Sequence, residues 1–118
     1  MKKILIAEDN DSNFILMTYI LKKFYQFERA KNGKEAVEMA NANQYDLVLM
    51  DIKMPIMDGL EATKLIKKAH PELPIIALTA NAFDSDRQLA FDAGCNDFLS
   101  KPVSSDLCLK TIAKYVGE

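Results

Sequence analysis

Residues 47–59 read Leu-Val-Leu-Met-Asp-Ile-Lys-Met-Pro-Ile-Met-Asp-Gly. The apolar run ends at Asp51, and the residues after it, with Pro55 and Gly59, have the composition of an irregular loop. A short apolar run bounded in this way is typical of a strand that is buried on both faces of a parallel sheet. The stretch therefore predicts an α/β fold with Asp51 at the carboxyl end of a strand, where such folds bind ligands.

Other β-rich apolar runs occur along the chain, and longer segments of helical period separate them. This alternation is typical of βαβ units, in which helices cover both faces of a parallel sheet. We therefore predict an α/β fold, a doubly wound (βα)5 sheet with strand order 2-1-3-4-5. The predicted strands are residues 3–8, 26–30, 46–51, 75–79 and 96–100.

The predicted helices follow capping or turn residues. The first begins after Asn10-Asp11-Ser12, the third is capped by Asp58, the fourth spans residues 84–93 before a left-handed Gly94, and the last spans 104–116. Helical spacing predicts which side chains face the sheet. In chain order these are Met17, Ile20, Leu21, Phe24, Ala36, Val37, Ala40, Leu60, Thr63, Ile66, Ala69, Leu107, Cys108, Ile112 and either Tyr115 or Val116.

The size and composition indicate one compact domain over residues 1–118. The 15 basic and 17 acidic side chains are dispersed, so the chain by itself shows no nucleic-acid or membrane surface. A signal peptide and a membrane-spanning run are not expected, and a cytoplasmic location is the default expectation. Cys95 and Cys108, with a single histidine, predict neither a zinc site nor a disulfide framework.

Polar side chains occupy the ends of four predicted strands. Glu8 and Asp9 follow the first, Asp51 ends the third, Thr79 ends the fourth and Lys101 follows the fifth. In the predicted strand order they share one crevice, where three carboxylates repel one another unless a cation is present. Oxygen ligands alone favour Mg²⁺. A carboxylate nucleophile beside Mg²⁺, an ammonium and a hydroxyl predicts phosphoryl transfer to Asp51.

These residues lie in segments that together resemble the receiver domain of two-component response regulators. The segments are Glu8-Asp9-Asn10, residues 50–59, Ala77-Leu78-Thr79-Ala80 and Lys101-Pro102. They cover the whole chain in the family's order and are most similar to receivers of hybrid histidine kinases. The resemblance implies the flavodoxin-like (βα)5 fold, Mg²⁺ dependence, and phosphorylation of Asp51 by a phosphohistidine of a sensor kinase or histidine phosphotransfer domain.

The resemblance also implies roles for individual residues. Asp9, Asp51 and the backbone carbonyl of Lys53 are expected to ligate Mg²⁺, with Glu8 acting through water. Thr79 is expected to bind phosphoryl oxygens together with Lys101, whose loop we expect Pro102 to hold through a cis peptide bond. The domain is thus a phosphoacceptor rather than an enzyme with steady turnover.

The same family pattern implies a switch and a lifetime control. Phe98 occupies the position of the switch aromatic, without the hydroxyl of the commoner tyrosine, so that any switch rests on packing. Lys53 and Asn81 lie at positions that tune self-dephosphorylation. The surface of the fourth helix, fifth strand and fifth helix is the expected face for an output domain or effector.

Several functions remain alternatives at the level of sequence. Relay of the phosphoryl group and a conformational switch are both open, and so is a docking module of the same fold that works without phosphorylation. A phosphatase is disfavoured because Lys53 stands where a second acid would be needed to protonate the leaving group. A flavin module is disfavoured because the acidic residues after the first strand would repel a phosphate.

Overall fold

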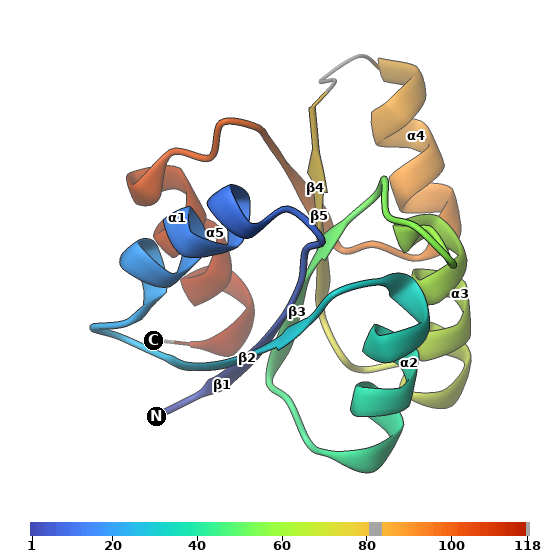
Figure 1. Cartoon of the computed structure of the whole chain (residues 1–118), viewed down its shortest axis with the longest axis horizontal. Coiled ribbons are helices and arrows are strands. Elements are labelled where there is room, and N and C mark those ends of the chain that lie inside the picture. The colour runs from blue at the N-terminus through green and yellow to red at the C-terminus, as the bar shows by residue number, and fades with distance from the viewer. Residues whose placement is uncertain (81–83, 118) are drawn as a thin grey trace.

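The computed structural model describes residues 1–80 and 84–117, with a five-stranded parallel sheet at its centre (Figure 1). The strand order is β2-β1-β3-β4-β5, which confirms the predicted doubly wound arrangement. The strands are β1 (Lys3–Ala7), β2 (Gln26–Ala30), β3 (Leu47–Asp51), β4 (Ile75–Thr79) and β5 (Asp97–Ser100). The helices are α1 (Asp11–Leu21), α2 (Gly33–Ala42), α3 (Gly59–Ala69), α4 (Asp84–Ala93) and α5 (Ser105–Val116).

Helices cover both faces of the sheet, with α1 and α5 on one side and α2, α3 and α4 on the other (Figure 1). Alternate residues of each central strand enter opposite cores: Ile4 and Leu49 pack with α1 and α5, whereas Leu5 and Val48 pack with α2 and α3. All five residues of β3 and of β4 are buried. Burial on both faces explains why these strands are continuous apolar runs rather than alternating ones.

Side chains cap the helix N-termini as the sequence predicts. Asn10 accepts a hydrogen bond from the Asn13 amide (3.0 Å), and Asp58 accepts one from the Glu61 amide (2.8 Å). Each bond satisfies one of the amides that the first helical turn leaves without a partner. Because α1 and α3 begin directly after the loops that follow β1 and β3, these caps also anchor the loops that carry Glu8, Asp9 and Asp51.

Gly59 brings the start of α3 against the end of β3. Its amide donates to the Ile52 carbonyl (2.7 Å), and a Cβ at this position would overlap the backbone carbonyl oxygen of Asp51. A side chain therefore does not fit between the loop and the strand. The close approach holds the start of α3 against the backbone of Asp51.

The structure corrects three predicted core positions. Phe24 is 53% exposed because α1 ends at Leu21, before this residue. Tyr25, the next residue, is buried instead. Ala69 is exposed, and Ala62 of the same helix is buried instead. Leu107 is 53% exposed in the first turn of α5.

Other details agree with the sequence. The strands begin or end within one residue of the predicted bounds, α4 spans residues 84–93, and Gly94 follows it with φ 112°. Cys95 and Cys108 are buried free thiols, and Met54 and Met57 are half-buried against the core below the loop after β3. Among residues 1–80 and 84–117, no helix is long and apolar enough to cross a membrane.

Candidate functional site

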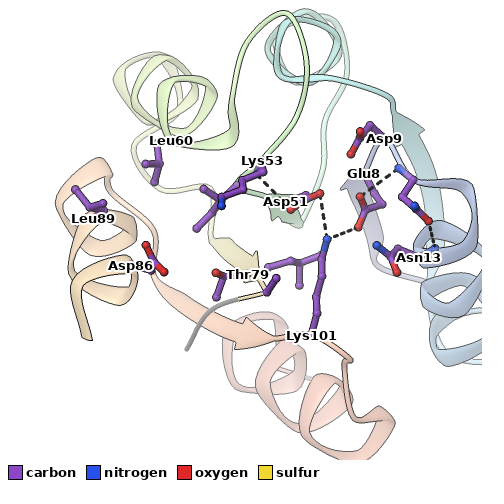
Figure 2. A pocket seen from close by; sticks show the side chains of 14 residues that line it. Glu8, Asp9, Asn13, Asp51, Lys53, Leu60, Thr79, Asp86, Leu89 and Lys101 are labelled. Atoms are coloured by element: carbon purple, nitrogen blue, oxygen red, sulfur yellow. Dashed lines mark hydrogen bonds and ion pairs between the residues drawn. The ribbon is translucent and has the colours of Figure 1, made fainter. Parts of the chain in front are cut away.

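Three carboxylates meet at the carboxyl edge of the sheet, where the strand order reverses between β1 and β3. Glu8 and Asp9 follow β1, and Asp51 is the last residue of β3. One carboxylate oxygen of each lies within 4.8 Å of those of the other two. Glu8 and Asp51 are buried, with 0% and 5% exposure, whereas Asp9 is exposed at the mouth of the crevice (Figure 2).

Lys101 reaches into this cluster from the loop after β5. Its Nζ lies 2.9 Å from Oε1 of Glu8 and 3.1 Å from Oδ2 of Asp51, so one ammonium bridges both buried acids (Figure 2). The Lys101–Pro102 peptide bond is cis, as predicted. The structure thus brings together an ammonium and two carboxylates from three strands that are far apart in the sequence.

The charges of these groups depend on one another. Burial and the neighbouring Glu8 raise the pKa of Asp51 to about 7, although Lys101 opposes the shift. Burial also acts to raise the pKa of Glu8, but the hydrogen bonding and charge of Asp51 and Lys101 outweigh it and lower that pKa. Burial would lower the pKa of Lys101, and the two acids raise it instead. Of the two buried carboxyls, Asp51 therefore holds a proton more tightly than Glu8 does.

The cluster fits a hard divalent cation. All three side chains offer oxygen, and Mg²⁺ prefers carboxylate oxygens and water to nitrogen or sulfur ligands. Oε1 of Glu8 is buried, and its partner among the described residues is the Lys101 ammonium at 2.9 Å. A cation among these acids would reduce the repulsion that burial strengthens. The donor set therefore has the chemistry of a magnesium site.

The whole cavity has a volume of about 240 Å³, and residues from several loops complete its lining. Thr79 ends β4 and is 8% exposed, and Lys53 is exposed two residues after Asp51, with its amide 3.4 Å from Oδ1 of Asp51. Both were predicted from the sequence to lie here. Figure 2 shows Thr79 and Lys101 across the cavity from Asp9.

One predicted residue lies away from this group. Phe98 on β5 does not line the cavity, and it packs edge to face against Phe91 of α4 with ring centroids 6.3 Å apart. The Arg87 guanidinium lies 5.2 Å from the Phe98 ring centroid. Asn81 lies outside the described residues.

Four residues that line the cavity lie outside the sequence segments that indicated the site: Asn13, Leu60, Asp86 and Leu89. Asn13 and Leu60 stand in the first turns of α1 and α3, and helices that begin at the carboxyl edge of a parallel sheet point their first turns toward the ligand site. That rule could have identified both. Asp86 and Leu89 belong to α4 and face the cavity opposite the acidic cluster (Figure 2).

Comparison with known proteins gives a family match. The family model described as "Response regulator receiver domain" matches residues 4–113. The chain is 41% identical over 99% of its length to hybrid signal transduction histidine kinase B of Dictyostelium discoideum. It spans only 7% of that relative's length, so the relative contains much that this chain does not.

Two solved structures resemble the fold closely. One is the receiver domain of sensor histidine kinase PA1611 from Pseudomonas aeruginosa, with a magnesium ion coordinated in its active site cleft; it has a TM-score of 0.92, 35% identity, and coverage of 99% of this chain and 98% of that chain. The other is the receiver domain of Ssk1 with the histidine phosphotransfer protein Ypd1 from Saccharomyces cerevisiae, with a TM-score of 0.92, 32% identity, and coverage of 98% and 89%.

Proposed function

The chain belongs to the response regulator receiver domain family, and from this membership we propose that it is a phosphorelay receiver that accepts a phosphoryl group on Asp51. The donor is a phosphohistidine of a histidine kinase or histidine phosphotransfer domain. The observation that carries the proposal is the Lys101 ammonium held between Glu8 and Asp51 in a cavity that Thr79 also lines. Receiver domains of two-component signalling are phosphoacceptors rather than classical enzymes.

In the proposed reaction a carboxylate oxygen of Asp51 attacks phosphorus. The new O–P bond forms as the P–N bond to the donor histidine breaks, and the imidazole leaves with the electron pair of that bond. Lys101 binds one phosphoryl oxygen and the hydroxyl of Thr79 donates to another, which orients the group for in-line transfer. The burial of Asp51 keeps the acyl phosphate away from bulk water.

Mg²⁺ is the proposed cofactor. Asp9, Asp51 and the backbone carbonyl of Lys53 would hold it, with Glu8 acting through a bound water. When bound, it supplies positive charge to phosphoryl oxygens and so offsets the repulsion between the donor and the acidic cluster. The magnesium ion in the PA1611 receiver supports this assignment.

The proposal extends to the events after phosphorylation. Lys53 and Asn81 tune the lifetime of the acyl phosphate. Thr79 is drawn toward the phosphoryl group while Phe98, which packs against Phe91 and lies near Arg87 in this structure, turns inward. The face formed by α4, β5 and α5 then presents a changed surface to an output domain or effector. Onward relay and switching both depend on the same phosphorylated Asp51.

The setting of the domain is also part of the proposal. We propose that residues 1–118 form one receiver unit in the cytoplasm. By itself, this unit would bind neither nucleic acid nor membrane. Its partners are a histidine kinase or a phosphotransfer domain, as the complex of the Ssk1 receiver with Ypd1 suggests for a receiver of the same fold. The small share of the Dictyostelium relative that it matches is consistent with a unit of a hybrid kinase.

Intact-mass spectrometry after incubation with acetyl phosphate tests the proposal. We expect a gain of about 80 Da, one phosphoryl group, that requires Mg²⁺ and is absent from Asp51→Asn. Asp58→Asn is the matched control, because it removes a carboxylate from the same loop while asparagine can still cap α3.

The opposite result is equally informative. If the wild-type protein stays unmodified with acetyl phosphate and with a phosphorylated histidine phosphotransfer domain, Asp51 is not a phosphoacceptor. The docking module would then be the better interpretation of the fold.

A further inference from the structure

Arg29 spans the two ends of the acidic loop after β1. It lies on β2, the neighbour of β1 at the edge of the sheet, where it pairs in register with Ile6 (Figure 1). Its Nε donates to the backbone carbonyl of Glu8 (3.0 Å), and its Nη2 lies 2.9 Å from Oδ1 of Asp11. One guanidinium therefore holds the residues on both sides of Asp9.

The bond to the Glu8 carbonyl controls the backbone between the two acids. A peptide unit is planar, so the Glu8 carbonyl and the Asp9 amide turn together. The Glu8 amide donates to the Ala30 carbonyl (3.0 Å), so β2 holds both ends of the Glu8 backbone. Because the Glu8–Asp9 peptide plane is fixed in this way, the position of the Asp9 Cα is set as well, which limits where its carboxylate can lie.

The guanidinium is itself held in place. Its Cζ lies 4.6 Å from the ring centroid of Phe14, and Phe14 packs edge to face on Phe27 with centroids 6.2 Å apart. The Arg29 side chain is only 16% exposed. Lysine could not reproduce this arrangement, because it has no planar fork of donors and no flat face to stack on a ring.

The charge of Arg29 is balanced by its own partner. A bare guanidinium beside the acidic cluster would repel a divalent cation. The Asp11 carboxylate, whose side chain is 82% exposed, neutralises this charge through its ion pair with Nη2. The pair therefore orients the loop without adding net positive charge to the site.

We propose that Arg29 is a positioning residue for the metal site, which holds the Glu8–Asp9 peptide so that both carboxylates face the cation. The proposal rests on the magnesium ligands named under the proposed function. It assigns to a residue on β2 a role in cation affinity, although Arg29 contacts neither the cation nor the phosphoryl group.

Mg²⁺ titration by isothermal calorimetry on Arg29→Lys tests this role. Outer partners of metal ligands typically contribute roughly tenfold or more to affinity, so we expect the Kd for Mg²⁺ to rise by about tenfold. We also expect the carbonyl ¹³C shift of Glu8 to change in the metal-free protein. Lys31→Met is the matched control, because it removes an exposed positive charge two residues further along the chain and should leave the Kd unchanged.

A purely structural role predicts a different pattern. Arg29→Lys would then lower the melting temperature, while the Mg²⁺ affinity measured well below that temperature would equal that of the wild type; this result would overturn the proposal. If Arg29→Lys does not fold, Asp11→Asn replaces it, because Asp11 is a surface residue. That variant should weaken Mg²⁺ binding by roughly threefold, the size of an exposed ion pair, and an unchanged Kd would again overturn the proposal.

The outcome also separates this proposal from the function itself. If the wild-type protein binds Mg²⁺ and gains the phosphoryl group, and Arg29→Lys binds Mg²⁺ with the same affinity, only the role of Arg29 is contradicted. A wild-type protein that does neither contradicts both.

Discussion

The Lys101 ammonium, which we propose binds a phosphoryl oxygen, already has two carboxylate partners. It is shared by Glu8 and Asp51 at 2.9 Å and 3.1 Å, so it is oriented before any donor arrives. In the proposed reaction, an arriving phosphoryl oxygen would compete with these two acids for the same ammonium. A cation bound by the two acids would offset their negative charge and weaken their hold on the ammonium. This is a physical reason for the cation and Lys101 to act together.

Ile56 has the least favourable backbone of the loop after β3. It adopts φ 70°, the left-handed region that β-branched residues avoid, and its side chain is 79% exposed. Relief of this strain is worth about 1–2 kcal/mol, and the extra freedom of glycine in the unfolded chain costs about 0.5–1 kcal/mol. We therefore expect Ile56→Gly to raise the free energy of unfolding by about 1 kcal/mol in urea titrations.

The control for Ile56 is the same substitution in a helix. Ile15 is 52% exposed within α1, so Ile15→Gly should lower the free energy of unfolding by about 1 kcal/mol. If both variants lose stability equally, the left-handed backbone of Ile56 is not strained.

Cys108 predicts a loss of stability at alkaline pH. Burial raises the pKa of its thiol to about 12, from 9.0 for an ordinary cysteine. The folded state therefore favours the neutral thiol, a contribution that is complete below pH 9 and is lost as the pH rises from 9 to 12. At pH 10.5 the loss is about 2 kcal/mol relative to pH 8.

Comparison with Cys108→Ala isolates this contribution. The variant lowers stability at pH 8 because it leaves a small cavity, but it cannot ionise. The difference in unfolding free energy between wild type and variant should therefore shrink between pH 8 and pH 10.5. A difference that stays constant would mean that the thiol ionises as easily in the folded as in the unfolded chain.

At the scale of an element, α3 can pack against the end of β3 only because Gly59 has no side chain. Because a Cβ at Gly59 would meet the Asp51 carbonyl oxygen, Gly59→Ala must displace either the helix or the end of β3. Overpacking of this kind costs about 1–3 kcal/mol, and we expect a loss at the upper end because both neighbours are backbone atoms. Urea unfolding measures this loss, and mass spectrometry should show slower phosphorylation.

Gly117 provides the comparison for Gly59. It follows α5 with φ 78°, but nothing lies within 4 Å of a Cβ built there. Gly117→Ala should therefore cost only the conformational penalty, about 1 kcal/mol. The steric explanation for Gly59 is wrong if its substitution costs no more than that of Gly117.

The strands and helices could be predicted because their burial and their ends leave clear patterns in the sequence. Strands β3 and β4 are buried on both faces and read as continuous apolar runs, while caps such as Asn10 and Asp58 mark helix starts. At the ends of helices, helical spacing did not predict correctly which side chains are buried. Leu107 lies in the first turn of α5 and is exposed, whereas Thr111 is buried with its hydroxyl donating to the Leu107 carbonyl (2.7 Å), a local bond that periodicity does not reveal.

The site was predictable to the extent that it consists of strand ends. Glu8, Asp51, Thr79 and Lys101 follow apolar runs and so fall at one sheet edge once the strand order is known. Arg29 was missed because its role depends on the reach of a long side chain from one strand to the next. No spacing along the sequence encodes such a contact.

At the scale of the whole molecule, the cavity is made from segments that lie at both ends of the chain. Glu8 and Lys101 are separated by 92 intervening residues, and their ion pair forms only when β5 has joined β4. Contacts between such distant residues are slow to form during folding. If Asp51 accepts a phosphoryl group as proposed, a chain still emerging from the ribosome has its acids but not yet the Lys101 ammonium beside them, and it should not react with a phosphorylated donor until β5 has docked.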